Sequence, residues 1–383
     1  MVARNPAVIS VVHVATRMNI GGASLMIIDL LNGLDEDRFH QVLIHGQTSG
    51  DEGSIFTRVS SGRQCEVIPH LRRSPNLWRD VRSLLTLIQA FRRLRPHIVH
   101  THMAKAGALG RLAAWIAGVP IRVHTYHGHL LTGYFPRWKT ALVVGIERLL
   151  SRITAFSIVD GGPPREDLIR VRVINHSDSR SIPPAVTALH RLSTADARRT
   201  FGLSSAEKIV GYVGRLSPIK RPDRFVSLAR QLPEVQFAIF GDGPMAEEIT
   251  RETAKLNNIS CLGWQVDLNR VMSAINLLVL TSDNEGMPLS VMEAASIGVP
   301  TVALNSGGVS ELIVNGVTGT IVEHEDQLTA AVTHLINDEE LLRQMGAAAQ
   351  TRALKEFSLQ RYIQSHQEVY LALLKGRLTD PSL

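Results

Sequence analysis

Short β-rich runs alternate with helical patterns along this chain, and that alternation limits its fold more than any other feature. In the first half, the β-rich runs are Val8–Thr16, Gln41–His45, Glu66–Ile68, His97–His102 and Arg122–Tyr126. Helical patterns fall between them at Ala23–Leu34, Leu77–Leu94 and Ala104–Ala117. A period that switches from strand to helix and back predicts βαβ units and therefore a parallel sheet.

The second half repeats this alternation. Its β-rich runs are Lys208–Val213, Val235–Phe240, Ile259–Leu262, Leu277–Thr281 and Thr301–Leu304. Its helical patterns are Pro222–Leu232, Pro244–Asn257, Leu289–Ile297 and Val309–Ile313. Because 383 residues suit two domains, we expect an α/β chain of two Rossmann-like, doubly wound domains facing each other across a cleft. Such sheets bind ligands at the carboxyl ends of their strands.

The domain boundary is expected in the polar stretch that Asp160-Gly-Gly-Pro-Pro and Ile182-Pro-Pro bracket, which is the best linker candidate. The predicted divisions are residues 1–180, 181–355 and a tail at 356–383. The pattern from Asp338 to Leu374 predicts one continuous helix.

Composition excludes several classes of protein. No apolar run approaches the ~20 residues that span a bilayer, and the start lacks the long apolar region of a signal peptide. Only Cys65 and Cys261 occur, so unpaired, buried thiols in a reduced cytoplasmic setting are expected.

Positive charge gathers in the first half: residues 1–190 carry 23 Lys and Arg against 13 Asp and Glu. This favours an anionic partner, either a membrane face or a phosphate-bearing substrate. A solvated arginine-rich surface explains the charge equally well. No aromatic residues interleave the basic ones as in nucleic-acid binders, so we expect no nucleic-acid partner.

The acidic loop and helix in Glu285-Gly-Met-Pro-Leu-Ser-Val-Met-Glu293 form the first candidate site. A strand ends near Thr281, and Pro288 is expected in the first turn of the following helix. Backbone N–H groups at Met287, Leu289 and Ser290 then suit an anion such as a diphosphate. Beside it, Glu285 and Glu293 can accept hydrogen bonds from sugar hydroxyls. Equally, Glu285 could cap the helix and Glu293 could be a surface charge.

A second candidate lies in Gly211-Tyr-Val-Gly-Arg215-Leu-Ser-Pro-Ile-Lys220-Arg221. A strand delivers Arg215 to its carboxyl end, and Lys220 and Arg221 open the next helix. Converging cations suit a diphosphate. The alternative, charges that merely flank a helix, is credible for Arg221 and weaker for Arg215.

Other motifs carry less weight. The partial glycine pattern Phe240-Gly-Asp-Gly-Pro lacks the third glycine of a dinucleotide site, so a nicotinamide cofactor is rejected, and no P-loop occurs. Gly21 and Gly22 allow a ligand close to the backbone, or form only a tight turn.

The histidines of the first half gather at strand ends, in the pair His100/His102 and the group His124/His127/His129. Neither set has a cysteine or acid at ligand spacing, so no metal site is predicted. His127 is the histidine most suited to donate to a substrate oxygen.

Together these motifs resemble the retaining glycosyltransferases of the GT-B fold, specifically glycosyltransferase family 4. The matching stretches are Val213–Lys220, Phe240–Pro244, Glu285–Glu293 and Ala295–Ile313, with Asn19–Ala23, His102–Arg111 and Val123–His129 in the first half. The resemblance implies an N-terminal acceptor domain, a C-terminal nucleotide-sugar domain and a C-terminal helix that packs back on the first.

The resemblance also implies a metal-independent hexosyl transfer from a nucleotide-diphosphate sugar, UDP before GDP, to a hydroxyl acceptor of polysaccharide, glycolipid or natural-product synthesis. The acceptor is a small molecule, an oligosaccharide or a lipid-linked species, and the enzyme could contact the inner membrane face peripherally. The residues implied to bind the donor are Gly21, Gly22, Arg215, Lys220, Gly286, Met287, Pro288, Leu289 and Glu293. His127 and Glu285 are implied to contact the donor sugar or support its transition state.

Two stretches depart from the family pattern, at Phe156–Pro164 and at Ile174–Ser181, and Arg221 replaces the glycine that commonly follows the lysine. Two alternatives therefore stay open. One is a nucleotide-sugar epimerase of GT-B fold, although such enzymes carry different acidic motifs. The other is a catalytically silent nucleotide-sugar-binding partner protein.

Overall fold

The computed structural model describes residues 8–19, 21–47, 59–60, 62–128, 136–186, 189–205 and 207–376. These residues form two compact units. Unit 1 contains the described residues up to 185 together with those from 359 to 376, and unit 2 contains those from 186 to 358. The chain therefore enters unit 2 and returns to unit 1 for its final helix.

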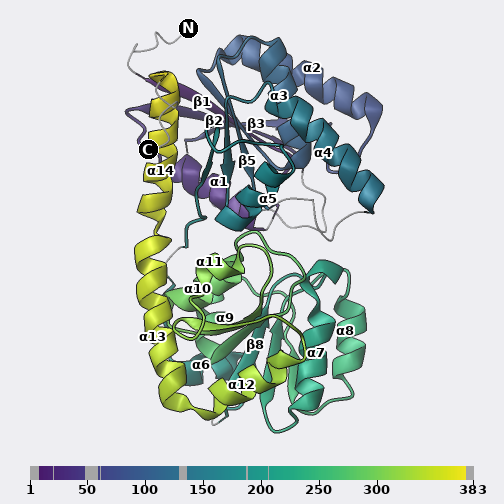
Figure 1. Cartoon of the computed structure of the whole chain (residues 1–383), viewed down its shortest axis with the longest axis vertical. Coiled ribbons are helices and arrows are strands. Elements are labelled where there is room, and N and C mark those ends of the chain that lie inside the picture. Colours follow the sequence, from purple (N-terminus) through teal and green to yellow (C-terminus); the bar gives the residue numbers. More distant parts are fainter. Residues whose placement is uncertain are drawn as a thin grey trace. The chain divides into compact units, whose positions relative to one another are not determined.

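Unit 1 is built on a seven-stranded parallel sheet in the order β3-β2-β1-β4-β5-β6-β7. Figure 1 labels β1, β2, β3 and β5 of this sheet. The strands are β1 (Ile9–Ala15), β2 (Phe39–Gly46), β3 (Gln64–Ile68), β4 (Ile98–His102), β5 (Ile121–Tyr126), β6 (Phe156–Val159) and β7 (Ser179–Ser181). The helices are α1 (Gly22–Gly33), α2 (Leu77–Leu94), α3 (Ala104–Ile116), α4 (Arg137–Ser151), α5 (Gly162–Arg170) and α14 (Leu359–Leu374).

Helices cover both faces of this sheet, as the alternation along β1 shows. Val12 packs into a core with Leu87 of α2 and Ala113 of α3, whereas its neighbour Val11 packs into a core with Leu30 of α1 and Tyr370 of α14. Successive residues of a strand face opposite sides. Burial on both faces explains why the strands read as nearly continuous apolar runs.

Unit 2 repeats the architecture with a six-stranded parallel sheet in the order β10-β9-β8-β11-β12-β13. Its strands are β8 (Ile209–Val213), β9 (Gln236–Phe240), β10 (Ile259–Cys261), β11 (Leu277–Leu280), β12 (Thr301–Leu304) and β13 (Gly319–Val322). Its helices are α6 (Thr194–Thr200), α7 (Pro222–Gln231), α8 (Ala246–Thr253), α9 (Leu268–Ala274), α10 (Leu289–Ser296), α11 (Val309–Leu312), α12 (Gln327–Asn337) and α13 (Glu339–Glu356).

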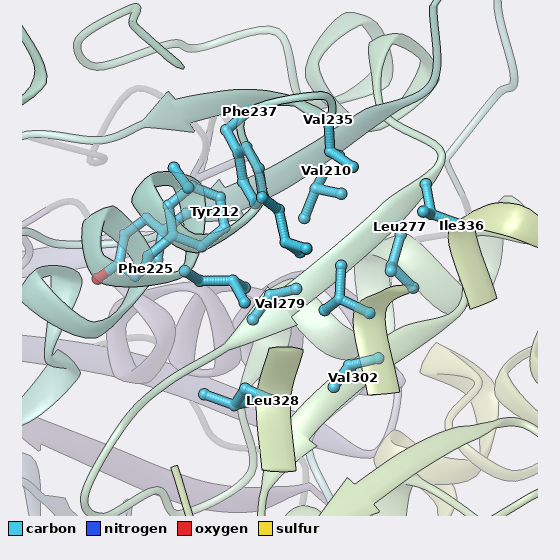
Figure 2. Packing of buried hydrophobic residues seen from close by; sticks show 14 of the residues in the cluster. Val210, Tyr212, Phe225, Val235, Phe237, Leu277, Val279, Val302, Leu328 and Ile336 are labelled. Carbon is cyan, nitrogen blue, oxygen red and sulfur yellow. The ribbon is translucent and has the colours of Figure 1, made fainter. Parts of the chain in front are cut away.

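One core of unit 2 joins the central strands to α7 and α12. Figure 2 shows Val210 and Val279, from neighbouring strands, packed with Phe225 of α7 and Leu328 of α12. All four side chains are at most 2% exposed. This packing fixes the strand ends from which the loops of the candidate site emerge.

The expected doubly wound α/β class is confirmed, while three local predictions were wrong. The stretch between Asp160 and Ile182 is no linker, because it contains α5 and β7 of the first sheet. The tail is not one helix, since α13 and α14 are separated at Phe357 and Ser358. Cys65 and Cys261 are unpaired as expected, but partly exposed rather than buried.

The separation of α13 from α14 has a physical reason. Phe357 packs in a core of unit 2, and its carbonyl accepts a hydrogen bond from Val186 N at 2.8 Å. Val186 and Ser358 also form a parallel bridge. The two points where the chain passes between units are thus tied together, and a straight helix could not provide that contact.

Both sheets have the strand order that creates a switch point, where neighbouring strands send their connections in opposite directions. The switch falls between β1 and β4 in unit 1 and between β8 and β11 in unit 2. Open α/β sheets bind ligands beyond the carboxyl ends of the strands at these places. The loops after β8 and β11 carry the two candidate motifs of the second half.

Candidate active site

Lys220 and Glu285 form an ion pair at the switch point of unit 2. Lys220 ends a short 3₁₀ turn after β8, and Glu285 lies in the loop between β11 and α10. The Lys220 Nζ lies 2.6 Å from both Glu285 carboxylate oxygens. The Glu285 side chain is only 5% exposed, whereas that of Lys220 is 31% exposed. The structure thus brings together Lys220, which was predicted to bind the diphosphate, and Glu285, which was predicted to bind the sugar.

The carboxylate of Glu285 has a further fixed partner. The Ser282 hydroxyl donates to its Oε1 at 2.6 Å, and Asp283 N donates to Ile219 O at 2.9 Å. These contacts hold the loops after β8 and β11 together. A carboxylate held by two donors keeps its orientation, which is what a group that reads sugar hydroxyls requires.

Arg215 presents its side chain at the same strand edge. It is exposed and makes no hydrogen bond or ion pair with any residue that the structure describes. Its backbone is fixed, because the Tyr212 hydroxyl donates to its carbonyl at 3.1 Å. Burial and the neighbouring Glu285 and Asp223 raise the pKa of Tyr212, so its phenol remains a donor. Arg215 is therefore a cation on a fixed turn that can bind an anionic ligand.

The glycine pattern after β9 has a packing role. A side chain at Gly241 would place its Cβ 1.9 Å from Gly214 O, and one at Gly243 would meet Leu216 O at 2.4 Å. Gly214 N in turn donates to Phe240 O at 3.1 Å. These glycines let the loop after β9 approach the turn that carries Arg215.

Arg221 forms part of a network of ion pairs and, unlike Arg215, is not available to a ligand as a separate cation. It adopts a left-handed conformation with φ of 50°. Its guanidinium donates a hydrogen bond to Asp223 at 2.7 Å, and the guanidinium of Arg224 donates one to Asp283 at 2.5 Å. The alternative that the sequence left open for Arg221, a charge flanking the helix, is the one that the geometry favours.

The backbone ahead of α10 differs slightly from the expectation. Pro288 is the N-cap residue and α10 begins at Leu289, so Pro288 does not occupy the first turn. The first N–H groups of any helix lack partners within it, which leaves Leu289 and Ser290 able to donate to a ligand. Glu293 is half-buried on this helix.

The twin glycines after β12 press against the loop of Glu285, a contact that the sequence did not indicate. A Cβ at Gly308 would lie 1.9 Å from Gly286 O, and Gly308 N donates to Glu285 O at 3.1 Å. A Cβ at Gly307 would meet Glu285 O at 1.8 Å. The loop's shape therefore depends on residues without side chains at both positions.

In unit 1, Gly21 is the N-cap of α1 and Gly22 is its first residue, directly beyond β1. A Cβ on Gly21 would meet only Asn19 Nδ2, at 3.7 Å. Among the described residues, packing therefore does not require a glycine at this position. Gly21 and Gly22 lie in unit 1, apart in the sequence from the residues of unit 2 described above.

His127 follows β5, and both of its ring nitrogens have protein partners. Its Nδ1 lies 3.3 Å from Asp160 Oδ2, and its Nε2 lies 3.1 Å from His102 Nδ1. Its side chain is 7% exposed. Sequence reasoning missed Asp160 because it treated that stretch as a linker. His129, which was grouped with His127, lies outside the described residues.

One cluster of histidines has the spacing of a metal site. His13, His100 and His102 each offer a nitrogen, and these atoms lie within 4.8 Å of one another. However, both nitrogens of His100 have partners at 2.6 Å, the Tyr370 and Thr125 hydroxyls. A metal would have to displace one of these hydroxyls, so the cluster as it stands fits a hydrogen-bonded core better.

Comparison with known proteins identifies the family. The family described as Glycosyltransferase Family 4 matches residues 20–188, and that described as Glycosyl transferases group 1 matches residues 193–352. The chain belongs to these glycosyltransferases. The resemblance expected from the motifs is therefore confirmed, and the group 1 match covers the site residues of unit 2.

Relatives of this glycosyltransferase act on several sugars. It is 25% identical to the UDP-Gal:alpha-D-GlcNAc-diphosphoundecaprenol alpha-1,3-galactosyltransferase of Escherichia coli, over 96% of this chain and 98% of that protein. It is 26% identical to the N-acetyl-alpha-D-glucosaminyl L-malate synthase of Bacillus anthracis, over 73% and 75% of the two chains.

Solved structures establish the fold. Anabaena HepE, crystallised with UDP and glucose, superposes with a TM-score of 0.82 at 21% identity, over 95% of this chain and all of that one. A second structure, that of TarM, superposes with a TM-score of 0.72 at 14% identity, over 95% of this chain and 98% of that one. The glycosyltransferase has the GT-B fold, as expected.

Proposed function

We propose that this glycosyltransferase moves a hexosyl group from a UDP-sugar to a hydroxyl acceptor, with retention and without a metal ion. The observation that carries the proposal is the pair between Lys220 and the buried carboxylate of Glu285, at the same switch point as the exposed cation Arg215. The UDP in HepE and the UDP-Gal in the name of the Escherichia coli relative support UDP over GDP. The product belongs to polysaccharide, glycolipid or natural-product synthesis.

In this proposal, the donor's diphosphate binds Arg215 and Lys220 together with the N–H groups of Gly286, Met287 and Leu289, while Pro288 lines the same loop. Glu285 accepts hydrogen bonds from the sugar and Glu293 from the ribose. Because the diphosphate competes for Lys220, donor binding loosens the ion pair and frees the Glu285 oxygens to accept from the sugar hydroxyls, while the Ser282 hydroxyl keeps the carboxylate in place. The cations then offset the charge that a metal would otherwise neutralise.

The transfer itself needs no covalent intermediate. The bond from the anomeric carbon to the phosphate oxygen breaks, and its electron pair stays on the diphosphate. The acceptor hydroxyl attacks from the same face, and its proton passes to the departing phosphate oxygen. Excluding water from the site suppresses hydrolysis of the donor.

A donor panel tests this function. The enzyme is incubated with UDP- and GDP-hexoses, with and without EDTA, and the products are followed by NMR. Slow release of UDP that EDTA leaves unchanged supports the proposal, and release of the α-anomer of the free hexose from an α-linked donor, seen before it mutarotates, supports retention. An epimerised sugar would identify an epimerase instead, and binding without turnover would identify a silent partner protein.

An exposed apolar surface on unit 1 bears on the acceptor. Helix α3 packs between α2 and α4 (Figure 1), and this layer exposes large apolar side chains. They are Leu77, Trp78, Val81 and Leu85 of α2, Trp115 and Ile116 of α3, and Trp138, Leu142, Ile146 and Leu149 of α4. Within α2, the apolar side chains of the second half, such as Leu87 and Phe91, are buried, whereas those of the first half are exposed.

The charges around this surface are positive. Exposed Arg79, Arg82, Arg137, Lys139 and Arg148 accompany the apolar side chains on α2 and α4. The acids of these helices are paired elsewhere, Asp80 with Lys105 at 2.6 Å and Glu147 with the buried Arg111 at 2.8 Å. Among the described residues, no helix is long and apolar enough to cross a bilayer.

We therefore propose that this layer rests on an anionic bilayer and that the acceptor is lipid-linked. Exposed tryptophans with flanking arginines suit the boundary between headgroups and acyl chains. Flotation with vesicles of anionic or neutral lipid tests this proposal. The Trp138→Ser/Leu142→Ser variant should lose binding to anionic vesicles, while Trp264→Ser, at an exposed position of unit 2, should not. Equal flotation of both variants would contradict it.

A further inference from the structure

A chain of four side chains crosses four neighbouring strands of unit 1. Asp160 follows β6, His127 follows β5, His102 ends β4 and His13 lies in β1, and these strands are adjacent in the sheet. From Asp160 Oδ2 to His127 Nδ1 the distance is 3.3 Å, from His127 Nε2 to His102 Nδ1 it is 3.1 Å, and from His102 Nε2 to His13 Nδ1 it is 3.3 Å.

The carboxylate at one end of this row of hydrogen bonds determines which nitrogen of each ring donates and which accepts. A carboxylate only accepts hydrogen bonds, so His127 must carry its proton on Nδ1 and, when neutral, accept at Nε2. His102 then donates from Nδ1 and accepts at Nε2, and His13 donates from Nδ1. The last nitrogen, His13 Nε2, is left bare.

The buried end of the row is compatible with this assignment. His13 Nε2 and Gln41 Oε1 have no partner in hydrogen-bond geometry among the described residues, and an unpartnered acceptor is tolerated in a core more readily than an unpartnered N–H. Burial lowers the pKa of His13 and of His102, so both rings are neutral. Gln41 favours the opposite direction, because a hydrogen bond with its side chain raises the pKa of His13 and only an Nε2–H could donate it.

The other titratable groups around the chain leave it intact, because each has its own partner. His100 bonds to Tyr370 and Thr125, His124 to Thr101 at 2.9 Å, and His366 Nδ1 to Tyr362 O at 2.9 Å. Arg111 is paired with Glu147, and Arg180 with Glu368.

We propose that Asp160, His102 and His13 are positioning residues that fix the ring and the tautomer of His127. This inference rests on the proposed function only in its activity arm, which takes His127 to act on a substrate of the transfer. With both nitrogens held, the His127 ring cannot rotate, and its plane at the carboxyl edge of β5 is set by a chain that ends in the core.

Nitrogen NMR of the ¹⁵N-histidine-labelled full chain tests the assignment without any substrate. We expect His13, His102 and His127 all to carry the proton on Nδ1. In Asp160→Ala, the carboxylate that sets the direction of the hydrogen bonds is gone. The opposite direction places a proton on His13 Nε2, near Gln41 Oε1. All three histidines should therefore move their proton from Nδ1 to Nε2. His45, whose Nδ1 bonds to Gly46 O on β2, serves as the control and should stay unchanged.

Two results would overturn the inference. One is an Nε2-protonated His102 or His127 in the native protein, which decides the matter even where Asp160→Ala fails to fold. The other is binding of one equivalent of Zn²⁺ that shifts the signals of His13, His100 and His102, which would make this cluster a metal site.

Activity provides the second arm. His102→Leu removes the bond to His127 and should lower kcat by ~10–100-fold, the effect of a slightly misplaced group, with little change in the donor KM. His102→Asn keeps a donor and should recover most of the loss. Equal losses in both variants would contradict positioning through this bond. Absence of turnover in the native enzyme would count against the proposed function alone, because the NMR result stands without it.

Discussion

Lys220 and Glu285 neutralise each other across the switch point of unit 2, with Nζ 2.6 Å from both carboxylate oxygens. In the proposed function, each group also binds part of the nucleotide sugar, Lys220 its diphosphate and Glu285 its sugar hydroxyls. The pair thus keeps a buried carboxylate compensated until a ligand offers both groups new partners. Substitutions at either end should therefore have different effects.

Glu285→Ala should abolish transfer while UDP binds as tightly as before or more tightly. The substitution removes the acceptor for the sugar hydroxyls and leaves Lys220 available to the diphosphate. Calorimetric titration with UDP, beside an assay of transfer, checks this. A collapse of UDP affinity would show that Glu285 serves the nucleotide instead.

Arg215→Ala should weaken UDP binding by about 1.5–3 kcal/mol, the range for hydrogen bonds to charged groups, without changing the thermal midpoint. Its side chain is exposed and forms no hydrogen bond or ion pair with the described residues, so folding should not depend on it. Arg343→Ala, on an exposed pair of α13, is the matched control and should alter neither property. Unchanged affinity in Arg215→Ala would exclude this cation from the diphosphate site.

Gly308→Ala should disrupt the donor site through sterics alone. The new Cβ would lie 1.9 Å from Gly286 O, so the loop that carries Glu285 must move, at a cost of about 1–3 kcal/mol. Activity and unfolding midpoint both report the effect. Gly145→Ala, on α4 with nothing within 4 Å, should leave activity intact, and an equally harmless Gly308→Ala would contradict the predicted clash.

Unit 1 should unfold first as pH falls. Burial lowers the pKa of His13 to about 3 and of His366 to about 4, and it lowers those of His100, His102 and His124 as well. The unfolded chain binds protons at these histidines near pH 6.5, whereas the folded chain does not. Above pH 6.5 these histidines do not destabilise the folded unit. Below pH 6.5 the free energy of unfolding decreases by roughly 1.4 kcal/mol per pH unit for each histidine.

Urea unfolding between pH 7 and 4.5, followed by hydrogen exchange in each unit, measures this dependence. His366→Met removes one ionisable group and should reduce the slope by about one proton. A slope unchanged by the variant, or acid unfolding that begins in unit 2, would show that the buried histidines do not control the acid transition.

Local patterns predicted most of the fold because burial on both faces marks each strand so strongly. Helix α2 has the predicted bounds, Leu77–Leu94. The short β6 and β7 were missed, since four and three residues beside glycines and prolines look like a linker. The end of α13 was missed because it depends on a contact between residues far apart in the sequence. The helix stops where Phe357 O accepts a hydrogen bond from Val186 N.

The site shows the same division. The sequence predicted which residues of the loops after β8 and β11 carry charge, and adjacent strands bring Lys220 and Glu285 together. It could not predict that they pair with each other, nor that His13 meets His102 across 89 positions. Such contacts depend on strand order, which no local pattern contains.

Helix α14 belongs to unit 1, where the Tyr370 hydroxyl lies 2.6 Å from His100 Nδ1 and the ring sits fully buried against Phe39. The ribosome makes this helix only after the whole of unit 2. The sheet that leaves the exit tunnel first must therefore wait, with one flank uncovered, for a segment synthesised last. A fragment cut after residue 185 would lack that flank for good, so an expression strategy based on separate halves should supply the helix in trans or fuse it through a short tether.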